Sequence, residues 1–315
     1  MSRIHEALKR AEQDRQTTHR DGMGKESSGH QPSDRMALSS EPEPSPVYAA
    51  VADASLATDS SRLRLEELQA NCVAAKWNLD PKLLLFSNSN PIASGAEQFR
   101  TLRSRLYRLR ESQPLHKILI TSSIPSEGKS FVAANLAQVM VRQSGCRVLL
   151  IDADLRAPTL HKTLGAPLTP GLADYLQGER SELEVIQRGT EDGLFFIPAG
   201  KHVTHPAELI ATNKFKMLLD SVSDLFDWVI LDSPPTVPVS DASVLAHMCD
   251  GVLFVVRGGS TPAEVCSKGC RELQNAPLIG VVLNAVKQSS ASDPYYGYGT
   301  TSYGLNISAS HGKQS

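Results

Sequence analysis

The chain has 315 residues, of which 41% are hydrophobic, 21% charged and 5% aromatic, a composition typical of globular proteins rather than of wholly disordered chains. Its 32 basic and 34 acidic residues give a formal net charge of −2, which argues against nucleic-acid binding through bulk charge. Its apolar runs fall well short of the roughly 18 residues of a membrane span, and no apolar segment typical of a secretory signal follows the charged N-terminus. We therefore expect a cytoplasmic protein that binds no nucleic acid.

The five cysteines are odd in number and include no CxxC pair, so the sequence favours reduced thiols over a disulfide framework. Cys266 and Cys270 are four residues apart and fit one face of a helix, but a zinc site would need two further ligands at suitable spacing. We interpret this pair as two small buried residues.

The first part of the chain carries little apolar sequence. Apolar residues recur at helical spacing from Ile4 to Ala11, and Ser2 can cap the helix, so we expect an amphipathic interaction helix over residues 1–16. Residues 17–77 are rich in proline, serine and charged residues and cannot bury enough surface to offset the entropy of ordering. They are predicted to form a flexible linker that contains a weak helix between about residues 61 and 77.

Residues 78–287 change to strands that alternate with helices. The apolar runs predict strands at 117–122, 147–151, 194–198, 228–232, 251–256 and 278–283. The helical spacing of apolar residues predicts helices at 94–109, 129–144, 213–225, 240–247 and 262–274. Near-continuous apolar strands separated by helices favour a doubly wound α/β domain, with a mostly parallel sheet that is covered on both faces.

The C-terminal segment, residues 288–315, contains seven serines and almost no charge, so it is predicted to be a disordered tail. It also holds four of the seven tyrosines of the chain, namely Tyr295, Tyr296, Tyr298 and Tyr303.

The segment from Ser123 to Ser130, SIPSEGKS, lies between a predicted strand and a predicted helix. It fits the phosphate-binding P-loop, or Walker A, pattern except that Ser123 replaces the first glycine. In such a loop, backbone amides at a helix N-terminus hold phosphate oxygens. Gly128 lets the backbone approach, Lys129 reaches the β- and γ-phosphates, and the Ser130 hydroxyl binds Mg²⁺. Taken alone, the match also fits an ordinary strand-to-helix turn with a solvated lysine.

Carboxylates stand at the ends of two further apolar strands. Asp152 and Asp154 follow one apolar run, and Asp232 follows another. In an open parallel sheet the carboxyl ends of the strands line the ligand crevice, so these acids are expected to face the P-loop. Each aspartate alone fits a helix cap or a turn. Three such features in chain order instead predict an ATP and Mg²⁺ site, with Asp232 as the Walker B carboxylate.

The motifs TSSIPSEGKS, LLIDADLR and VILDSPP, in this order, resemble those of the bacterial tyrosine kinases of the polysaccharide copolymerase system, a family related to the MinD/ParA P-loop ATPases. Ser122 and Ser123 occupy the region where those ATPases carry an extra lysine, whereas the DxDxR element that ends at Arg156 marks the kinase branch. The resemblance extends from about residue 81 to the C-terminus. It implies an ATP-dependent protein-tyrosine autokinase that phosphorylates its tail in trans and regulates capsular or exopolysaccharide synthesis and export.

The resemblance also implies a role for each site residue. The catalytic residues are Lys129, Asp152, Asp154 and Arg156. Either Asp152 or Asp154 deprotonates the attacking phenol, and the family resemblance favours Asp152; a phenol with a pKa of about 10 needs such a base at neutral pH. Arg156 either neutralises developing charge or pairs with these acids. The nucleotide is bound by Ser126, Glu127, Gly128, Lys129, Ser130, Phe131 and Asn284. The Mg²⁺ ligands are Ser130, Asp152, Asp154 and Asp232, and the phosphoacceptors are Tyr295, Tyr296, Tyr298 and Tyr303.

Glu97, Arg100 and Arg103 match the ExxRxxR helix by which protomers of this family assemble into rings, although the same residues fit an ordinary surface ion pair. The resemblance further implies a partner, a transmembrane polysaccharide chain-length regulator, which activates the kinase and recruits it to the inner face of the plasma membrane. Two other functions stay open at this point: a MinD/ParA-like ATPase switch, and a nucleotide-binding adaptor without kinase activity. The paired acids and the tyrosine tail favour the kinase.

Overall fold

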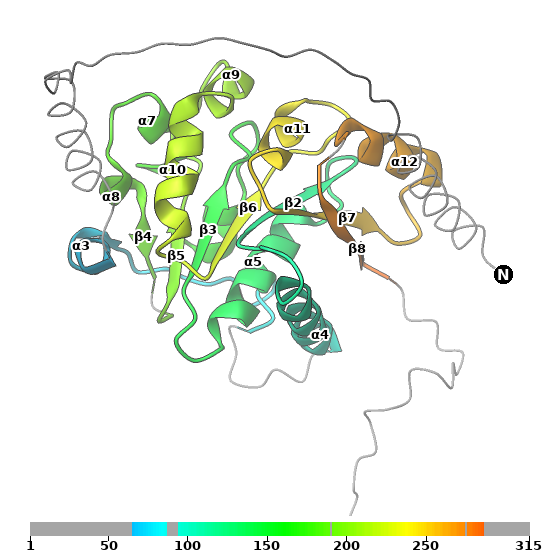
Figure 1. Cartoon of the computed structure of the whole chain (residues 1–315), viewed down its shortest axis with the longest axis horizontal. Coiled ribbons are helices and arrows are strands. Elements are labelled where there is room, and N and C mark those ends of the chain that lie inside the picture. The colour runs from blue at the N-terminus through cyan, green and yellow to red at the C-terminus, as the bar shows by residue number, and fades with distance from the viewer. Residues whose placement is uncertain (1–64, 87–93, 190, 275, 287–315) are drawn as a thin grey trace, which may run out of the picture. The chain divides into compact units, whose positions relative to one another are not determined.

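The described part of the chain comprises residues 65–86, 94–189, 191–274 and 276–286 of a computed structural model (Figure 1). The helix expected over residues 1–16, the linker up to residue 64 and the tail 288–315 with its four tyrosines lie outside this part. Among the described helices, none combines the length and the apolarity that a membrane crossing requires.

Eight strands form one sheet in the order β1-β4-β5-β3-β6-β2-β7-β8. Neighbouring strands are parallel except β4 and β5, which are antiparallel. This confirms the mostly parallel sheet predicted from the sequence. The strands are β1 Val73–Ala74, β2 Lys117–Ser122, β3 Val148–Asp152, β4 Gln187–Arg188, β5 Leu194–Ile197, β6 Trp228–Asp232, β7 Gly251–Arg257 and β8 Leu278–Asn284.

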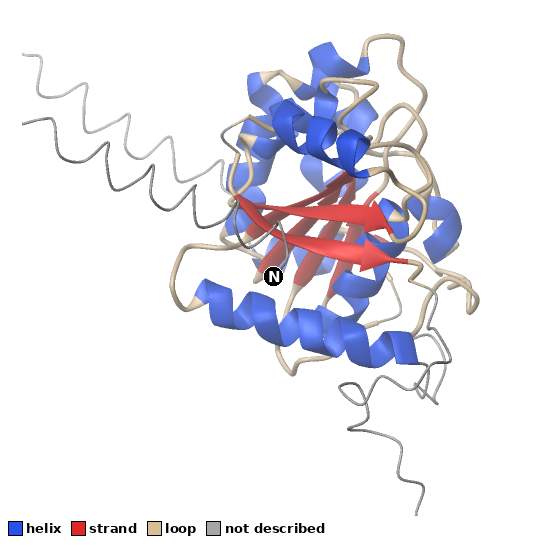
Figure 2. Cartoon of the chain, turned by 90° about the vertical axis from the view of Figure 1, so that its right-hand side faces the viewer, coloured by secondary structure: helices blue, strands red, loops and turns tan. Residues whose placement is uncertain are grey.

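Helices cover both faces of the sheet, as Figure 2 shows. One core joins alternate strand residues such as Leu119 and Leu231 to α3, α7–α12. The other joins the intervening residues, such as Ile118 and Ile230, to α4–α6. The helices are α3 Leu65–Asn71, α4 Ser94–Arg110, α5 Lys129–Val141, α6 Leu160–Leu164, α7 Leu172–Leu176, α8 Glu182–Val185, α9 Pro206–Ile210, α10 Asn213–Ser223, α11 Asp241–Ala246 and α12 Ala263–Glu272. Because successive strand residues point to opposite faces, apolar runs of this kind bury both faces at once.

Every strand and helix predicted over residues 78–287 is present, with ends that differ by up to three residues. The strands 117–122 and 228–232 agree at both ends. Helices α6, α7, α8 and α9 and the two-residue strands β1 and β4 were not predicted. These elements are two to five residues long, too short for a hydrophobic period to identify them.

The folded domain begins before the predicted boundary at residue 78. Residues 65–77 were assigned to the linker, but α3 and β1 lie within them, and β1 pairs with β4. Leu68 is fully buried in one core and Trp77 is largely buried in the other. The predicted weak helix is confirmed only as α3, and a few well-placed apolar side chains order this segment despite its polar composition.

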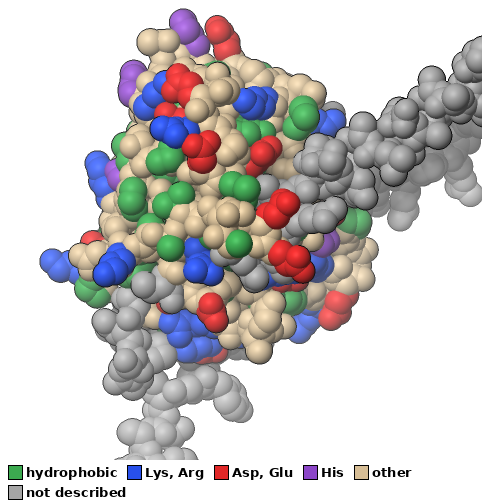
Figure 3. Space-filling model, turned by 90° about the vertical axis from the view of Figure 1, so that its left-hand side faces the viewer, with side chains coloured by type: hydrophobic (Ala, Val, Ile, Leu, Met, Phe, Trp, Pro, Cys, Tyr) green, Lys and Arg blue, Asp and Glu red, His purple; other side chains and the backbone are tan. Residues whose placement is uncertain are grey.

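The edge of the sheet near α3 and α8 belongs to the face seen in Figure 3. Acidic, basic and apolar side chains are interspersed among the described residues of this face. Such a mixed surface lacks the clustered positive charge that nucleic-acid backbones select.

Candidate active site

The loop between β2 and α5 has the backbone conformation of a phosphate-binding loop. Its positive φ angles fall on Ser126, at 66°, and on Gly128, at 97°. A β-carbon at Gly128 would lie 1.9 Å from Nδ2 of Asn284, so this position requires glycine for its φ angle and for the close approach. The Val132 amide bonds to the Gly128 carbonyl at 2.9 Å, and the earlier amides of α5 have no helical partner. These amides are available to an anion.

Ser123 is tolerated in place of the usual first glycine because its φ angle is not among the positive ones. The side chain is buried, and the Ser123 carbonyl accepts the Val237 amide at 3.1 Å. Helix α12 also packs closely here, since a β-carbon at Gly269 would lie 2.8 Å from the Ser123 hydroxyl. The departure from the P-loop pattern therefore does not alter the loop backbone.

Asp152 and Asp232 are register partners at the carboxyl ends of β3 and β6, and both are fully buried. Asp152 accepts the amides of Asp154 and Leu160 at 3.3 and 3.2 Å. Neither Asp232 carboxyl oxygen has a partner at normal hydrogen-bond geometry within the described residues, although the Ser130 hydroxyl and the Ser233 amide are near enough to lower the pKa of Asp232. Unpartnered carboxyl oxygens in a buried site are costly unless a cation or water approaches them. Both acids were expected to face the P-loop; the structure adds that they are direct neighbours, and Asp232 has free ligand capacity.

The two buried acids hold protons more tightly than ordinary carboxyl groups. Burial, together with the charges of Asp232 and Asp154, raises the pKa of Asp152 well above its usual value. Burial raises the pKa of Asp232 to about 7, although the positive charge of Lys129 acts in the opposite direction. A bound cation would favour the ionised form of both acids.

Asp154 and Ser130 are the other two residues that were predicted to bind Mg²⁺. Asp154 retains 7% exposure and accepts the Ala157 amide at 3.0 Å. The Thr159 hydroxyl donates to that of Ser130 at 2.9 Å. Across the described residues, no cluster of three or more His, Cys, Asp and Glu side chains forms a self-contained metal site. Mg²⁺ usually keeps waters and binds one or two carboxylates plus substrate phosphates, so these residues suit a metal–nucleotide complex.

Arg156 pairs with an acid that the sequence did not indicate. Its Nε and Nη2 atoms donate to the Asp241 carboxylate at 2.7 and 2.9 Å, and Asp241 is fully buried. The predicted pairing of Arg156 with Asp152 or Asp154 is therefore wrong for its hydrogen bonds. The Arg156 side chain is 39% exposed, so solvent screens the pair, and removing the arginine should cost less than the roughly 3–5 kcal/mol typical of a fully buried pair. If replacing Arg156 lowers activity, the loss would therefore combine any role of Arg156 in catalysis with the destabilisation caused by leaving Asp241 without its partner.

Three predicted nucleotide-binding residues have side chains engaged elsewhere. The Glu127 carboxylate turns to the Ile124 amide, at 2.8 Å, and away from the free amides of α5. The Phe131 ring packs edge-on against Phe99 of α4, with centroids 6.0 Å apart. The Asn284 side chain donates to the Glu127 carbonyl at 2.9 Å. Glu127 and Phe131 can therefore contact a nucleotide through the backbone, while Asn284 supports the loop.

The three residues of the ExxRxxR pattern divide into two roles on α4. Arg100 forms an ion pair with Glu97 at 2.9 Å, and the Glu97 side chain is 69% exposed. Arg103 instead donates to the Val139 carbonyl at 2.9 Å. This carbonyl belongs to the last turn of α5, where carbonyls have no helical partner and cations are favourable. Arg103 therefore contributes to the fold, Glu97 lies on the surface, and Arg100 is half-buried with its guanidinium over the Phe86 ring, 5.9 Å from the ring centroid.

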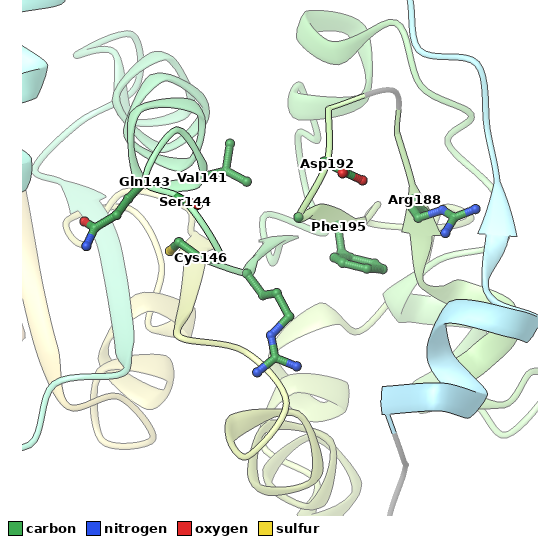
Figure 4. A pocket seen from close by; sticks show the side chains of 10 residues that line it. Val141, Gln143, Ser144, Cys146, Arg188, Asp192 and Phe195 are labelled. Carbon is green, nitrogen blue, oxygen red and sulfur yellow. The ribbon is translucent and has the colours of Figure 1, made fainter.

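A pocket of about 350 Å³ lies at the opposite end of the strands. It is lined by residues just before β3 and β5, with Cys146 on one side and Arg188 and Asp192 on the other (Figure 4). The P-loop and the three aspartates lie at the carboxyl ends of the strands, so this pocket is separate from the candidate nucleotide site. All five cysteines are free, as expected.

The family described as AAA domain matches residues 117–267, which run from the start of β2 to the middle of α12. The sheet order and the β2–α5 loop, together with this match, define a protein with the P-loop NTPase fold. It is 36% identical over 212 residues to the tyrosine-protein kinase YwqD of Bacillus subtilis, a match that covers 67% of this chain and 88% of YwqD. It is 33% identical over 252 residues to the tyrosine-protein kinase etk of Escherichia coli K12, covering 79% of this chain and 34% of that protein.

The solved kinase domain of the E. coli tyrosine kinase ETK aligns with a TM-score of 0.63 and 30% identity, covering 75% of this chain and 98% of that domain. The chain belongs to the bacterial tyrosine-protein kinase family. It spans most of YwqD but about a third of the longer etk protein. The family predicted from the three motifs is therefore confirmed.

Proposed function

We propose that this chain is an ATP-dependent tyrosine autokinase whose phosphoacceptors are Tyr295, Tyr296, Tyr298 and Tyr303. The observation that carries this proposal is the in-register pair of buried carboxyls, Asp152 and Asp232, beside the P-loop lysine. An ATPase fold needs one such acid for the metal. A second acid at the adjacent strand end, followed by Asp154, supplies a base for an incoming hydroxyl group.

Separate residues of the site bind the phosphates, hold the metal and accept the phenolic proton. The first amides of α5 and Lys129 hold the phosphates, while Ser130 and Asp232 hold Mg²⁺ directly or through water. When bound, Mg²⁺ neutralises charge on the phosphates. The tyrosine oxygen forms a bond to the γ-phosphorus, the bond from that phosphorus to the β–γ bridging oxygen breaks, and ADP leaves. The phenolic proton passes to Asp152 or Asp154. Asp152 has the raised pKa that makes a stronger base, and Asp154 has the more exposed carboxylate.

The direct test is incubation of the purified chain with ATP and Mg²⁺, followed by intact mass and an anti-phosphotyrosine blot. Addition of one or more phosphates to the tail peptide supports the kinase. ATP hydrolysis without phosphotyrosine would contradict it and favour a nucleotide switch. Binding without turnover would favour an adaptor.

We expect phosphate transfer between chains rather than within one. The tail follows β8, whose last residue, Asn284, already touches the P-loop. Tyr295 lies 11 residues beyond Asn284, a reach of at most about 40 Å, so length alone permits both routes. For transfer within one chain, the tail would have to reverse direction just after β8 and return to the P-loop. The tail of a neighbouring chain is not subject to this constraint.

A mixing experiment decides between these routes. A Lys129→Met chain with its tail, combined with an active chain truncated at Gln288, should acquire phosphotyrosine at a rate that rises with concentration. The Lys129→Met chain alone is the control and should stay unlabelled. Transfer in cis would give the opposite result. The Lys129→Met chain would stay unlabelled in the mixture, and a separate sample of full-length active chain would become labelled at a rate independent of its concentration.

We further propose that α4 joins protomers into a ring, and the structure identifies the better residue for testing this. Arg100→Glu should shift the unphosphorylated, ADP-bound protein towards monomer by light scattering. The surface ion pair contributes only about 0.2–1 kcal/mol, but the change also removes the guanidinium from the Phe86 ring, so the thermal unfolding of the variant is measured alongside. Arg103 is unsuitable because it supports α5. Arg108→Glu, an exposed change on the same helix, is the matched control. An unchanged oligomer in Arg100→Glu would refute this interface.

Phosphorylation supplies a way to reverse the assembly. Each phosphate adds about −1.5 to −2 charge to a tail that carries almost none. Several modified tails in one ring would repel one another, so the ring should dissociate as phosphate accumulates. By resemblance, we also propose that a transmembrane polysaccharide chain-length regulator recruits the chain to the membrane and that the cycle controls polysaccharide export.

A further inference from the structure

Glu127 places a carboxylate in the loop that is to receive phosphates, an arrangement that electrostatics alone disfavours. The side chain is nevertheless 1% exposed and fully occupied. Its Oε2 atom accepts the Ile124 amide at 2.8 Å. Its Oε1 atom accepts the Thr261 hydroxyl at 2.6 Å and the Arg257 amide at 3.3 Å. The carboxylate is therefore turned away from the phosphate side of the loop and stabilised by three hydrogen bonds from neutral donors.

Two further bonds hold the same stretch of loop from the same side. The Arg257 guanidinium donates to the Ser126 carbonyl at 3.0 Å, and the Asn284 amide donates to the Glu127 carbonyl at 2.9 Å. Donors from β7, from the connection after it and from the end of β8 thus take up the acceptors on the outer side of the loop. In a trans peptide the C=O and the following N–H point in opposite directions. Because the Ser126 and Glu127 carbonyls are held from the outer side, the N–H groups of Glu127 and Gly128 are directed to the inner side, as phosphate binding requires.

We propose that Glu127 and Thr261 are positioning residues for nucleotide binding, which hold the P-loop in its phosphate-receiving conformation before any ligand arrives. This rests on the nucleotide site of the proposed function. Without the Thr261 hydroxyl, the buried Glu127 carboxylate loses its shortest hydrogen bond. The P-loop then populates conformations that do not bind phosphate. The apparent nucleotide affinity then falls in proportion to the binding-competent fraction. The connection from Arg257 to Thr261 is therefore part of the nucleotide site although it offers no phosphate ligand of its own.

The test compares Thr261→Val, which keeps the shape and removes the hydroxyl, with Thr261→Ser, which keeps the hydroxyl. With the full chain, Mg²⁺ and a fluorescent ADP analogue, Thr261→Val should bind about tenfold more weakly, the loss typical of one hydrogen bond to a charged group. Thr261→Ser should bind like the unaltered chain. In the autophosphorylation assay, Thr261→Val should raise KM for ATP while kcat at saturating ATP stays within about twofold.

Glu127→Ala should weaken binding at least as much as Thr261→Val, and if it fails to fold, the threonine pair still decides the matter. Equal Kd values for Thr261→Val and the unaltered chain would overturn the proposal. A fall in kcat with KM unchanged would overturn it as well, because the residues would then act on the chemical step. Nucleotide binding without tyrosine phosphorylation in the unaltered chain would contradict the kinase proposal but leave this comparison intact.

Discussion

Lys129→Met is expected to reduce tail phosphorylation at least about 100-fold while leaving the nucleotide-free domain folded. Lys129 is 8% exposed, and its ammonium makes no hydrogen bond to another described residue. Methionine preserves most of the side-chain stem, so packing changes little. The lost charge acts where charge develops in the transition state, and groups of this kind typically contribute factors of about 10²–10³ or more.

Three measurements separate this effect from misfolding. Thermal unfolding without nucleotide should move little, nucleotide binding should weaken, and phosphotyrosine should disappear. Lys216→Met, an exposed change on α10, is the matched control and should retain activity. Phosphorylation at the unaltered rate in Lys129→Met would show that the P-loop lysine does not serve the reaction.

Asp232→Asn is expected to stabilise the metal-free protein at pH 8 while abolishing activity. The pKa of Asp232 is raised from its ordinary value of 3.8 to about 7 by burial. Between these two values the folded protein keeps a proton that the unfolded chain has released, so stability declines as pH rises from about 4 to about 7. Above pH 7 the aspartate is a buried charge, and replacing it with a neutral amide should recover on the order of a few kcal/mol.

The measurement is the free energy of unfolding in EDTA at pH 5 and pH 8. The gain from Asp232→Asn over the unaltered chain should be small at pH 5 and larger at pH 8. Asp224→Asn, at an exposed position after α10, should show no such trend. A gain that is equal at both pH values, or a loss at pH 8, would contradict the raised pKa. Under the proposed function, the lower stability of the unaltered chain at pH 8 is the cost of keeping an ionised Asp232 for Mg²⁺.

The sequence identified the parts of the site that are local. A strand, a turn with glycine before lysine, and a helix follow one another over residues 117–141, and their physical requirements can be read without knowing the fold. The acids at 152 and 232 were also predicted to face the P-loop, because parallel strands bring their carboxyl ends to one edge; the structure shows that β3 and β6 are neighbours. In each case, an apolar run that stops at a polar residue marks both the strand and the position of the side chain after it.

Only the tertiary structure decided which distant side chains support those parts. Arg156 meets Asp241 across 85 residues, and Thr261 meets Glu127 across 134. Asp241 looks like an ordinary residue at a helix start, and Thr261 like a turn residue. Likewise, the similarity of α4 to an oligomerisation helix gave no sign that Arg103 donates a hydrogen bond to the last turn of α5. The polar composition of the predicted linker gave no sign that Leu68 and Trp77 are buried. Such contacts follow from how separate elements pack, and neither spacing nor composition along the chain encodes that directly.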